Sequence, residues 1–206
     1  MPADHHNNTY FSLKRLLGKS LWPLYLVLLL IFLFFLSCES VWSNQAKISD
    51  IVITNNQDSL LVYFNIQGCF SPGMKKAILN GTGITFTFLI ELCKPYSFRP
   101  NNPLRSLKLY HTIKYDSLRE EFDVTLSEWG NQVFLWKDFS KSQEMMADVS
   151  NVPLIPLKVL GKNNHYQLRI KAELNKVRLP LTLRYILFFV SLWDFDTGWH
   201  VVDLIS

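Results

Sequence analysis

The sequence predicts a mainly β protein, an antiparallel β-sandwich or open barrel with two short helices, preceded by an N-terminal transmembrane or signal helix. Apolar and polar residues alternate in segment after segment between residues 48 and 175. A period of two is what a strand with one buried face requires. Antiparallel sheets with one solvated face show this alternation, whereas fully buried parallel strands are continuously apolar. A long uncharged run near the N-terminus predicts the preceding helix.

The N-terminal 38 residues are predicted to be a tail followed by a membrane-directed segment. Lys14, Arg15 and Lys19 precede Leu21 to Leu36, a run of sixteen residues without charge. The run lies between the apolar core of a signal peptide, about 7–15 residues, and a membrane span, about 17–25 residues. We therefore expect residues 21–38 to be a transmembrane anchor or a signal segment.

The positive-inside bias orients this segment. It makes residues 1–20 a short cytoplasmic basic tail and residues 44–206 an extracytoplasmic β-rich domain. Three fates of the segment remain open: retention as a single-span anchor, cleavage after Ser43 in VWSN, or lipidation at Cys38 in FLSC. The domain lies outside the cytoplasm under all three.

The first elements of the domain are a hairpin and a helix. Strands are expected at residues 48–54 and 59–67, joined by the turn cluster NNQDS. Ser71 is a good helix N-cap, and Pro72 fits the first helical position. Met74, Ala77 and Ile78 follow at helical spacing, and a glycine at position 81 or 83 ends the helix.

The clearest strand is ITFTFLIELC, residues 84–93. One face carries Ile84, Phe86, Phe88, Ile90 and Leu92. Segments 105–116, 122–127, 132–136 and 165–175 repeat the pattern. The prediction requires Phe86, Leu109 and Ile170, from three of these segments, to share one interior.

A second helix and a C-terminal piece complete the domain. In SKSQ, Ser140 and Gln143 have the spacing of a capping box, followed by apolar Met145, Met146 and Val149. Pro153 and Pro156 are expected to stop this helix. The C-terminal piece, residues 179–206, fits either a short helix through Phe189 or a buried edge of the core.

Charge argues against nucleic acid as a partner. The chain has a net charge of +4, and without the N-terminal tail 18 basic and 16 acidic residues remain. A nucleic-acid-binding domain usually carries a basic patch of its own. We therefore expect no nucleic acid partner.

Three cysteines leave one over if a disulfide forms. Cys38 ends the apolar run, so Cys69 and Cys93 are the candidate disulfide, which an oxidising compartment would permit. The alternative is two separate small buried residues. No cysteine or histidine spacing typical of a metal site occurs, and we expect no metal and no cofactor.

No catalytic constellation is evident. GxSxG, HExxH and the phosphate-binding glycine motifs are absent. His111 falls on an apolar strand face, His165 follows GKNN at a strand start, and His200 follows Trp199 in the last segment. Trp193, Asp194, Asp196 and Trp199 form the candidate loop site in WDFDTGW, where the two carboxylates could point together. A plain turn is the alternative for this loop, because Asp, Thr and Gly are turn residues.

Three ordered blocks carry a family resemblance. GITFTFLIEL, YHTIKYDSLREEFDV and YQLRIKAELNKVRLPLTLRYILFFVSLWDFDTGWH resemble the bacterial envelope proteins grouped as domain of unknown function 4390. The resemblance covers most of residues 48–200. It implies a bacterial exported protein, and it supplies no activity and no functional residues.

Together these observations predict a protein of the bacterial inner membrane, single-pass with its domain facing the periplasm, or else exported or lipid-anchored. We expect a non-catalytic binding or adaptor domain with an envelope protein partner. One alternative is a carrier or sensor of an apolar ligand such as a lipid. Others are a hydrolase using Asp194 and Asp196 or a histidine, and a purely structural envelope component.

Overall fold

The computed structural model describes residues 25–29, 46–95, 103–175 and 195–205. The chain divides into two units, Met1–Ser43 and Asn44–Ser206. Within the first unit, residues 25–29 are helical with exposed side chains. In the described ranges, no helix is both long and apolar enough to cross a membrane. The rest of the predicted anchor, including Cys38, lies outside the described residues.

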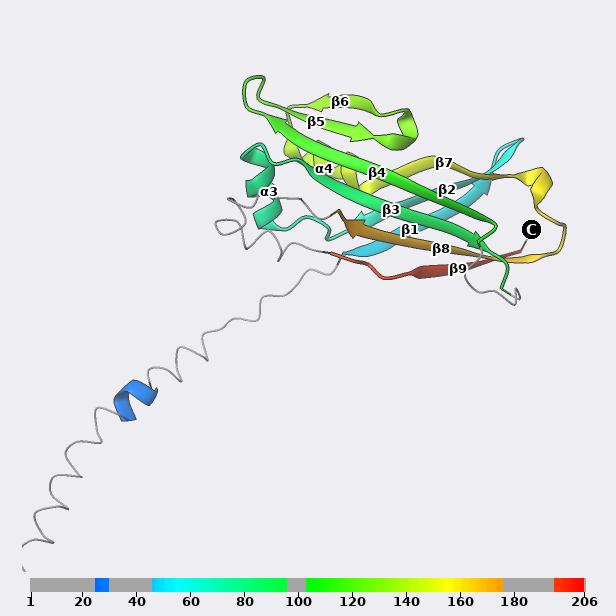
Figure 1. The fold of residues 1–206 in the computed structure, drawn as a ribbon, viewed down its shortest axis with the longest axis horizontal. Coiled ribbons are helices and arrows are strands. Elements are labelled where there is room, and N and C mark those ends of the chain that lie inside the picture. Colours follow the sequence, from blue (N-terminus) through cyan, green and yellow to red (C-terminus); the bar gives the residue numbers. More distant parts are fainter. Residues whose placement is uncertain (1–24, 30–45, 96–102, 176–194, 206) are drawn as a thin grey trace, which may run out of the picture. The chain divides into compact units, whose positions relative to one another are not determined.

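The second unit consists mainly of two antiparallel sheets (Figure 1). The three-stranded sheet has the order β1 (Lys47–Asn55), β2 (Ser59–Gln67) and β7 (Asp148–Pro156). The six-stranded sheet has the order β6 (Gln132–Trp136), β5 (Glu121–Leu126), β4 (Arg105–Asp116), β3 (Ile84–Cys93), β8 (His165–Leu174) and β9 (His200–Ile205). Both sheets are open, so the predicted mainly β, antiparallel class is confirmed.

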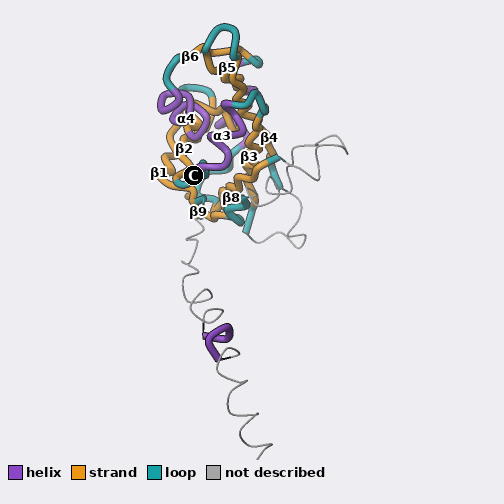
Figure 2. The backbone as a smooth tube through the Cα atoms, turned by 90° about the vertical axis from the view of Figure 1, so that its left-hand side faces the viewer, coloured by secondary structure: helices purple, strands orange, loops and turns teal. Residues whose placement is uncertain are grey.

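The apolar faces of the two sheets share one core. The end-on view in Figure 2 shows β1 and β2 on one side of the domain and β3 and β4 on the other. The five predicted inward residues of β3 are completely buried. The Phe88 ring meets the Phe64 ring of the other sheet with centroids 5.8 Å apart. Phe86, Leu109 and Ile170 belong to the same buried cluster. The shared interior predicted from the two-residue period is therefore confirmed.

The first helix, α3 (Pro72–Leu79), forms as its sequence predicts. The Ser71 side chain accepts a hydrogen bond of 3.2 Å from the Met74 N–H, and Pro72 occupies the first turn. The three apolar residues at helical spacing are all buried. Gly81, just beyond the helix, has φ +82°, a left-handed conformation that favours glycine.

The second helix, α4 (Phe139–Ala147), begins two residues earlier than the predicted capping box places it. Its N-cap is Asp138, whose Oδ1 accepts the Ser140 N–H at 2.8 Å, so the assignment of Ser140 as cap was wrong. The helix covers the inner face of β5 and β6. Phe139 packs on Phe122 of β5 with ring centroids 5.3 Å apart.

Strand β7 follows α4 directly, in a segment where we expected only a helix stop. Pro153 and Pro156 lie in this strand, which is tolerated because β7 is an edge strand with one side free of ladder partners. Asn151 has φ +59°, near an irregularity in the pairing with β2. Val149, Val152 and Leu154 still reach the core.

The last residues of the C-terminal piece form strand β9. Residues 200–205 pair with β8 and form an edge of the six-stranded sheet. The candidate helix from Pro180 through Phe189 lies outside the described residues.

Cys69 and Cys93 are buried and unbonded. The two thiols are separate in this structure, and the disulfide stays a prediction from the sequence. Burial raises the pKa of the Cys69 thiol to about 12. Because the thiolate is the reactive form, this thiol is inert near neutral pH.

Truncation of a core ring tests the shared interior. Phe88→Ala should lower the free energy of unfolding by about 3–5 kcal/mol, because Phe88 is fully buried between the sheets. Leu118→Ala, at a residue 95% exposed, should change it by less than about 0.5 kcal/mol. Urea unfolding of the purified full chain measures both variants. Equal losses in the two would contradict a core centred on β3.

Candidate functional site

An apolar groove of about 370 Å³ lies at one end of the domain, between the ends of the two sheets. Five strands and the short 3-10 helix η2 (Leu157–Val159), with the residue that follows it, contribute to the groove. Its lining residues are Ile53, Thr54, Asn55, Leu60, Leu92, Leu157, Leu160, Tyr166, Leu204 and Ile205. In Figure 1 it lies at the end where β9 finishes, near the label of the C-terminus.

The β1–β2 turn fixes one wall of the groove. The Asn56 side-chain oxygen accepts the N–H groups of Asp58 and Ser59 at 2.9 and 2.7 Å, so the turn is held by its own side chain. The Leu157 N–H donates to the Asp58 carbonyl at 2.8 Å. This bond ties η2 to the turn and places the leucines at positions 157 and 160 beside the sheet ends.

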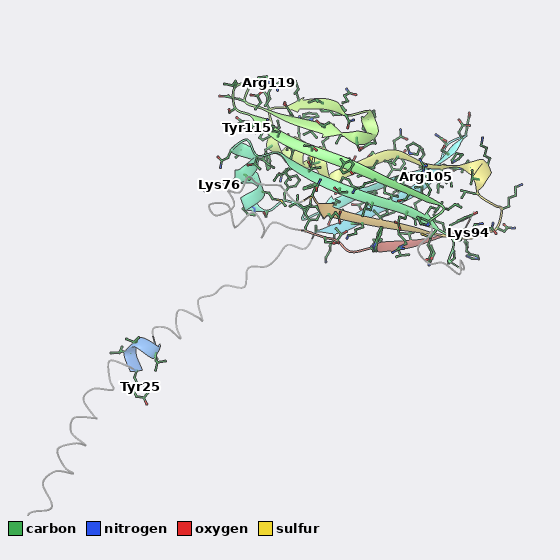
Figure 3. All side chains as sticks on the ribbon, viewed as in Figure 1. Tyr25, Lys76, Lys94, Arg105, Tyr115 and Arg119 are labelled. Carbon is green, nitrogen blue, oxygen red and sulfur yellow. The ribbon has the colours of Figure 1, made fainter. Side chains whose placement is uncertain are left out.

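Tyr166 is the largest buried side chain that lines the groove. Its hydroxyl accepts a hydrogen bond of 2.9 Å from the Gly161 N–H, which satisfies the polar end of a ring that is only 2% exposed. The Lys94 ammonium lies 6.0 Å from the ring centroid. Figure 3 shows Lys94 and Arg105 at this end of the domain, and Lys76 and Arg119 at the other.

The groove is thus apolar inside, with polar atoms of Thr54 and Asn55 among its lining and an ammonium group close by. A mostly apolar concave surface with a few polar groups is typical of small-molecule sites. Its chemistry suits an unbranched apolar chain with a polar or anionic end.

The candidate loop site is only partly described. Trp193 and Asp194 lie outside the described residues. Asp196 Oδ1 accepts the Gly198 N–H at 2.8 Å, and Gly198 has φ +66°. The Thr197 N–H donates to the Ala172 carbonyl at 3.0 Å, which docks the loop on β8. The Asp196–Gly198 bond is that of an Asx turn, which agrees with the plain-turn alternative for this part of the loop.

An ion pair of Asp196 and a cation–π contact of Trp199 hold the described part of this loop against the outer face of the six-stranded sheet. Asp196 Oδ2 lies 2.7 Å from Lys171 Nζ, and Glu173 lies 3.2 Å from the same ammonium. The Lys171 hydrogen bond holds the pKa of Asp196 below its usual value, and Asp196 in turn raises the pKa of Lys171. The Trp199 ring stacks on the Arg169 guanidinium at 4.6 Å. These side chains face away from the core, and none of them lines the groove.

His111 is a core histidine, as its position on an apolar face predicts. Its Nδ1 lies 3.0 Å from the Met146 carbonyl oxygen, and its Nε2 lies 2.7 Å from Glu128 Oε1. A carbonyl oxygen only accepts, so Nδ1 carries hydrogen, and a further proton must lie between Nε2 and the carboxylate. Through these two contacts, His111 joins β4 to α4 at Met146 and to the 3-10 helix η1 (Ser127–Trp129) at Glu128.

Among the described residues, no histidine forms an ion pair with Asp196 of the loop. His165 and His200 are exposed and begin β8 and β9, at opposite ends of this antiparallel pair. Asp196 has Lys171 as its closest charged partner. In the part of the chain that the structure describes, no three His, Cys, Asp or Glu residues are placed to hold a metal ion.

The sequence did not reveal the groove. Leu157 and Leu160 follow a segment that we had assigned as a helix stop, and Leu204 lies in the ambiguous C-terminal piece. The one signal available was weak: Asp203 separates the apolar residues Val202 and Leu204, which lie on the covered face of β9.

These features define a class, a mainly β domain of two open antiparallel sheets with an apolar groove at one end. The chain belongs to the family described as "Domain of unknown function (DUF4390)", which matches residues 43–203. The resemblance found in the three sequence blocks is therefore confirmed. No curated protein and no solved structure matches the chain.

Removal of the Lys171 ammonium tests the electrostatics of the loop. Lys171→Met should raise the pKa of Asp196, because the largest cause that lowers it is lost. The pair's contribution to stability is present at neutral pH and is lost as pH falls through the depressed pKa of the folded state. Carboxyl NMR titration measures the pKa, with Lys171→Arg as the charge-preserving control. An unchanged pKa in the methionine variant would contradict the pairing.

Proposed function

We propose that this protein is a non-catalytic binding domain held outside the bacterial cytoplasm, and that its groove binds the apolar chain of a lipid-like ligand. The observation that carries the proposal is the groove itself, about 370 Å³ and lined mainly by aliphatic side chains. Of the functions that the sequence left open, the carrier or sensor of an apolar ligand is the one that this surface favours.

Groove size limits the ligand class. Small-molecule pockets run from about 300 to 1,000 Å³, so this one is near the lower bound. A single acyl chain suits it better than a two-chain phospholipid. The Lys94 ammonium lies near the Tyr166 ring and has no carboxylate partner among the described residues. It would therefore attract an anionic head group.

The hydrolase alternative receives less support. Asp196 is engaged by Lys171 and by the Gly198 N–H, so it is not poised to activate a water molecule. A catalytic base needs hydrogen-bond reach to a substrate proton in an accessible site. His111 is fully buried, and its two nitrogens are already paired.

The location of the domain is proposed from the sequence. The uncharged run 21–36, preceded by basic residues, directs the chain to the membrane with its N-terminus in the cytoplasm. Retention as a single-span anchor in the inner membrane is the form we propose, with the domain facing the periplasm. A protein partner in the envelope would then receive the bound ligand or read its presence.

Reporter fusions test this topology. A C-terminal alkaline phosphatase fusion should be active, because this enzyme folds only outside the cytoplasm, and deletion of residues 21–38 should abolish the activity. Retention predicts an intact chain of 24.0 kDa in the membrane fraction. Cleavage would yield a shorter soluble chain, and lipidation would add mass that Cys38→Ser removes. An inactive full-length fusion would refute export.

Filling the groove tests the ligand. Leu204→Trp should reduce binding of a fluorescent C16 fatty acid to the purified full chain by about tenfold or more, because the larger ring occupies the acyl-chain volume. Val201→Trp, on the same strand but on the outer face, should leave binding unchanged. Titration by fluorescence gives the dissociation constants. Equal affinity in both variants, or no binding by the unaltered chain, would overturn the proposed ligand class.

A further inference from the structure

The two open sheets have four edge strands, and three of them carry features that oppose pairing with another chain. β1 has an irregularity between Ser49 and Val52, where Asp50 takes φ +54°. β7 contains two prolines. β9 carries Asp203 near its centre. Bulges, prolines and charges are the devices by which edge strands avoid adding a further strand.

β6 is the exception among these edges. Its sequence QVFLW has no charge, no proline and no glycine, and its pairing with β5 runs without a bulge. Val133 and Leu135 are 50% and 51% exposed on the outer face. Figures 1 and 2 place β6 at the outer margin of its sheet, with no described strand beyond it.

We propose that the free edge of β6 pairs antiparallel with β6 of a second copy of this chain, across a two-fold axis at Phe134. In this register Val133 lies opposite Leu135 of the other copy, and Gln132 lies opposite Trp136. Apolar side chains thus meet on both faces of the joined sheet. Lys137 falls opposite Asn131, so no like charges are brought together.

The same operation is unfavourable for β9. A two-fold axis at Asp203 sets two carboxylates opposite each other, and an axis at Val202 sets Asp203 against apolar Val201. Self-complementarity is therefore a property of β6 and not of every edge. Two further large hydrophobic side chains are exposed nearby in the chain: Tyr110 on β4, 40% exposed, and Trp129 on the 3-10 helix η1 between β5 and β6, 52% exposed.

A five-residue strand buries little area, so the dimer is weak in dilute solution. Two chains in one membrane meet at a much higher effective concentration than two in solution. The dimer rests on β6 alone and does not depend on the groove, to which no residue of β6 contributes.

Cross-linking of the full chain in lipid nanodiscs or in isolated membranes tests the register. In a Cys38→Ser background, Val133→Cys combined with Leu135→Cys should give a disulfide-linked dimer on mild oxidation. Val201→Cys combined with Asp203→Cys, a pair equally spaced on the outer face of β9, should remain monomeric. Cross-links to a different envelope protein in place of the self-dimer would overturn the choice of a second copy.

A matched charge substitution tests the edge itself. Val133→Lys should raise the dissociation constant of the dimer about tenfold or more, since a lysine on an edge opposes strand addition. Val201→Lys, at a position of nearly equal exposure (49%), should leave it unchanged. Sedimentation of the full chain in detergent over a concentration series measures both, and unaltered thermal melting confirms folding. Equal dimer dissociation constants for the two variants would refute the proposal, as would a monomer at every concentration together with absent cross-links. Either outcome would leave C16 fatty acid binding unaffected, so it would not bear on the proposed ligand.

Discussion

The buried face of β3 constrains every other element of the domain. Its five inward side chains are completely buried, and each contributes roughly 1.5–3 kcal/mol by leaving water. One sheet cannot cover its own face, so a second layer must lie over β3, and Phe64 of β2 meets Phe88 there. The ladders to β4 and β8 then set the register of the six-stranded sheet.

The groove follows from the same constraint. The three-stranded sheet cannot cover the whole inner face of the six-stranded sheet. Different elements therefore cover the remaining parts of that face. Over β5 and β6 the helix α4 fills the gap, with Phe139 on Phe122. At the end where β3 finishes at Leu92 and Cys93, the covering element is the three-residue helix η2. That smaller cover leaves Tyr166 and its aliphatic neighbours facing an open volume.

Much of the fold was predictable because its strands obey one rule. The sequence predicted seven of the nine described strands, and alternation predicted the core-facing side of five of them, β2, β3, β4, β5 and β8. It failed for β7, whose two prolines argue against a strand except at a sheet edge, and for β9, whose exposed face carries apolar Val201 and Ile205 beside Asp203. Helix α3 was predicted together with its N-cap, Ser71. The N-cap of α4, Asp138, was missed because Ser140 also fits a capping motif. The groove depends on distant sheet ends, which local patterns do not encode.

The proposed binding site in the groove and the proposed pairing edge of β6 are physically separate. The groove lies between the sheets at the end of β3, whereas β6 is at the far edge, with β4 and β5 between them. Coupling needs an element with two discrete arrangements that both sites bias. The intervening β3–β4 ladder is continuous from Ile84 to Leu92, without a bulge or slip. A continuous ladder offers no such element, so we expect the proposed ligand affinity to be independent of the proposed association.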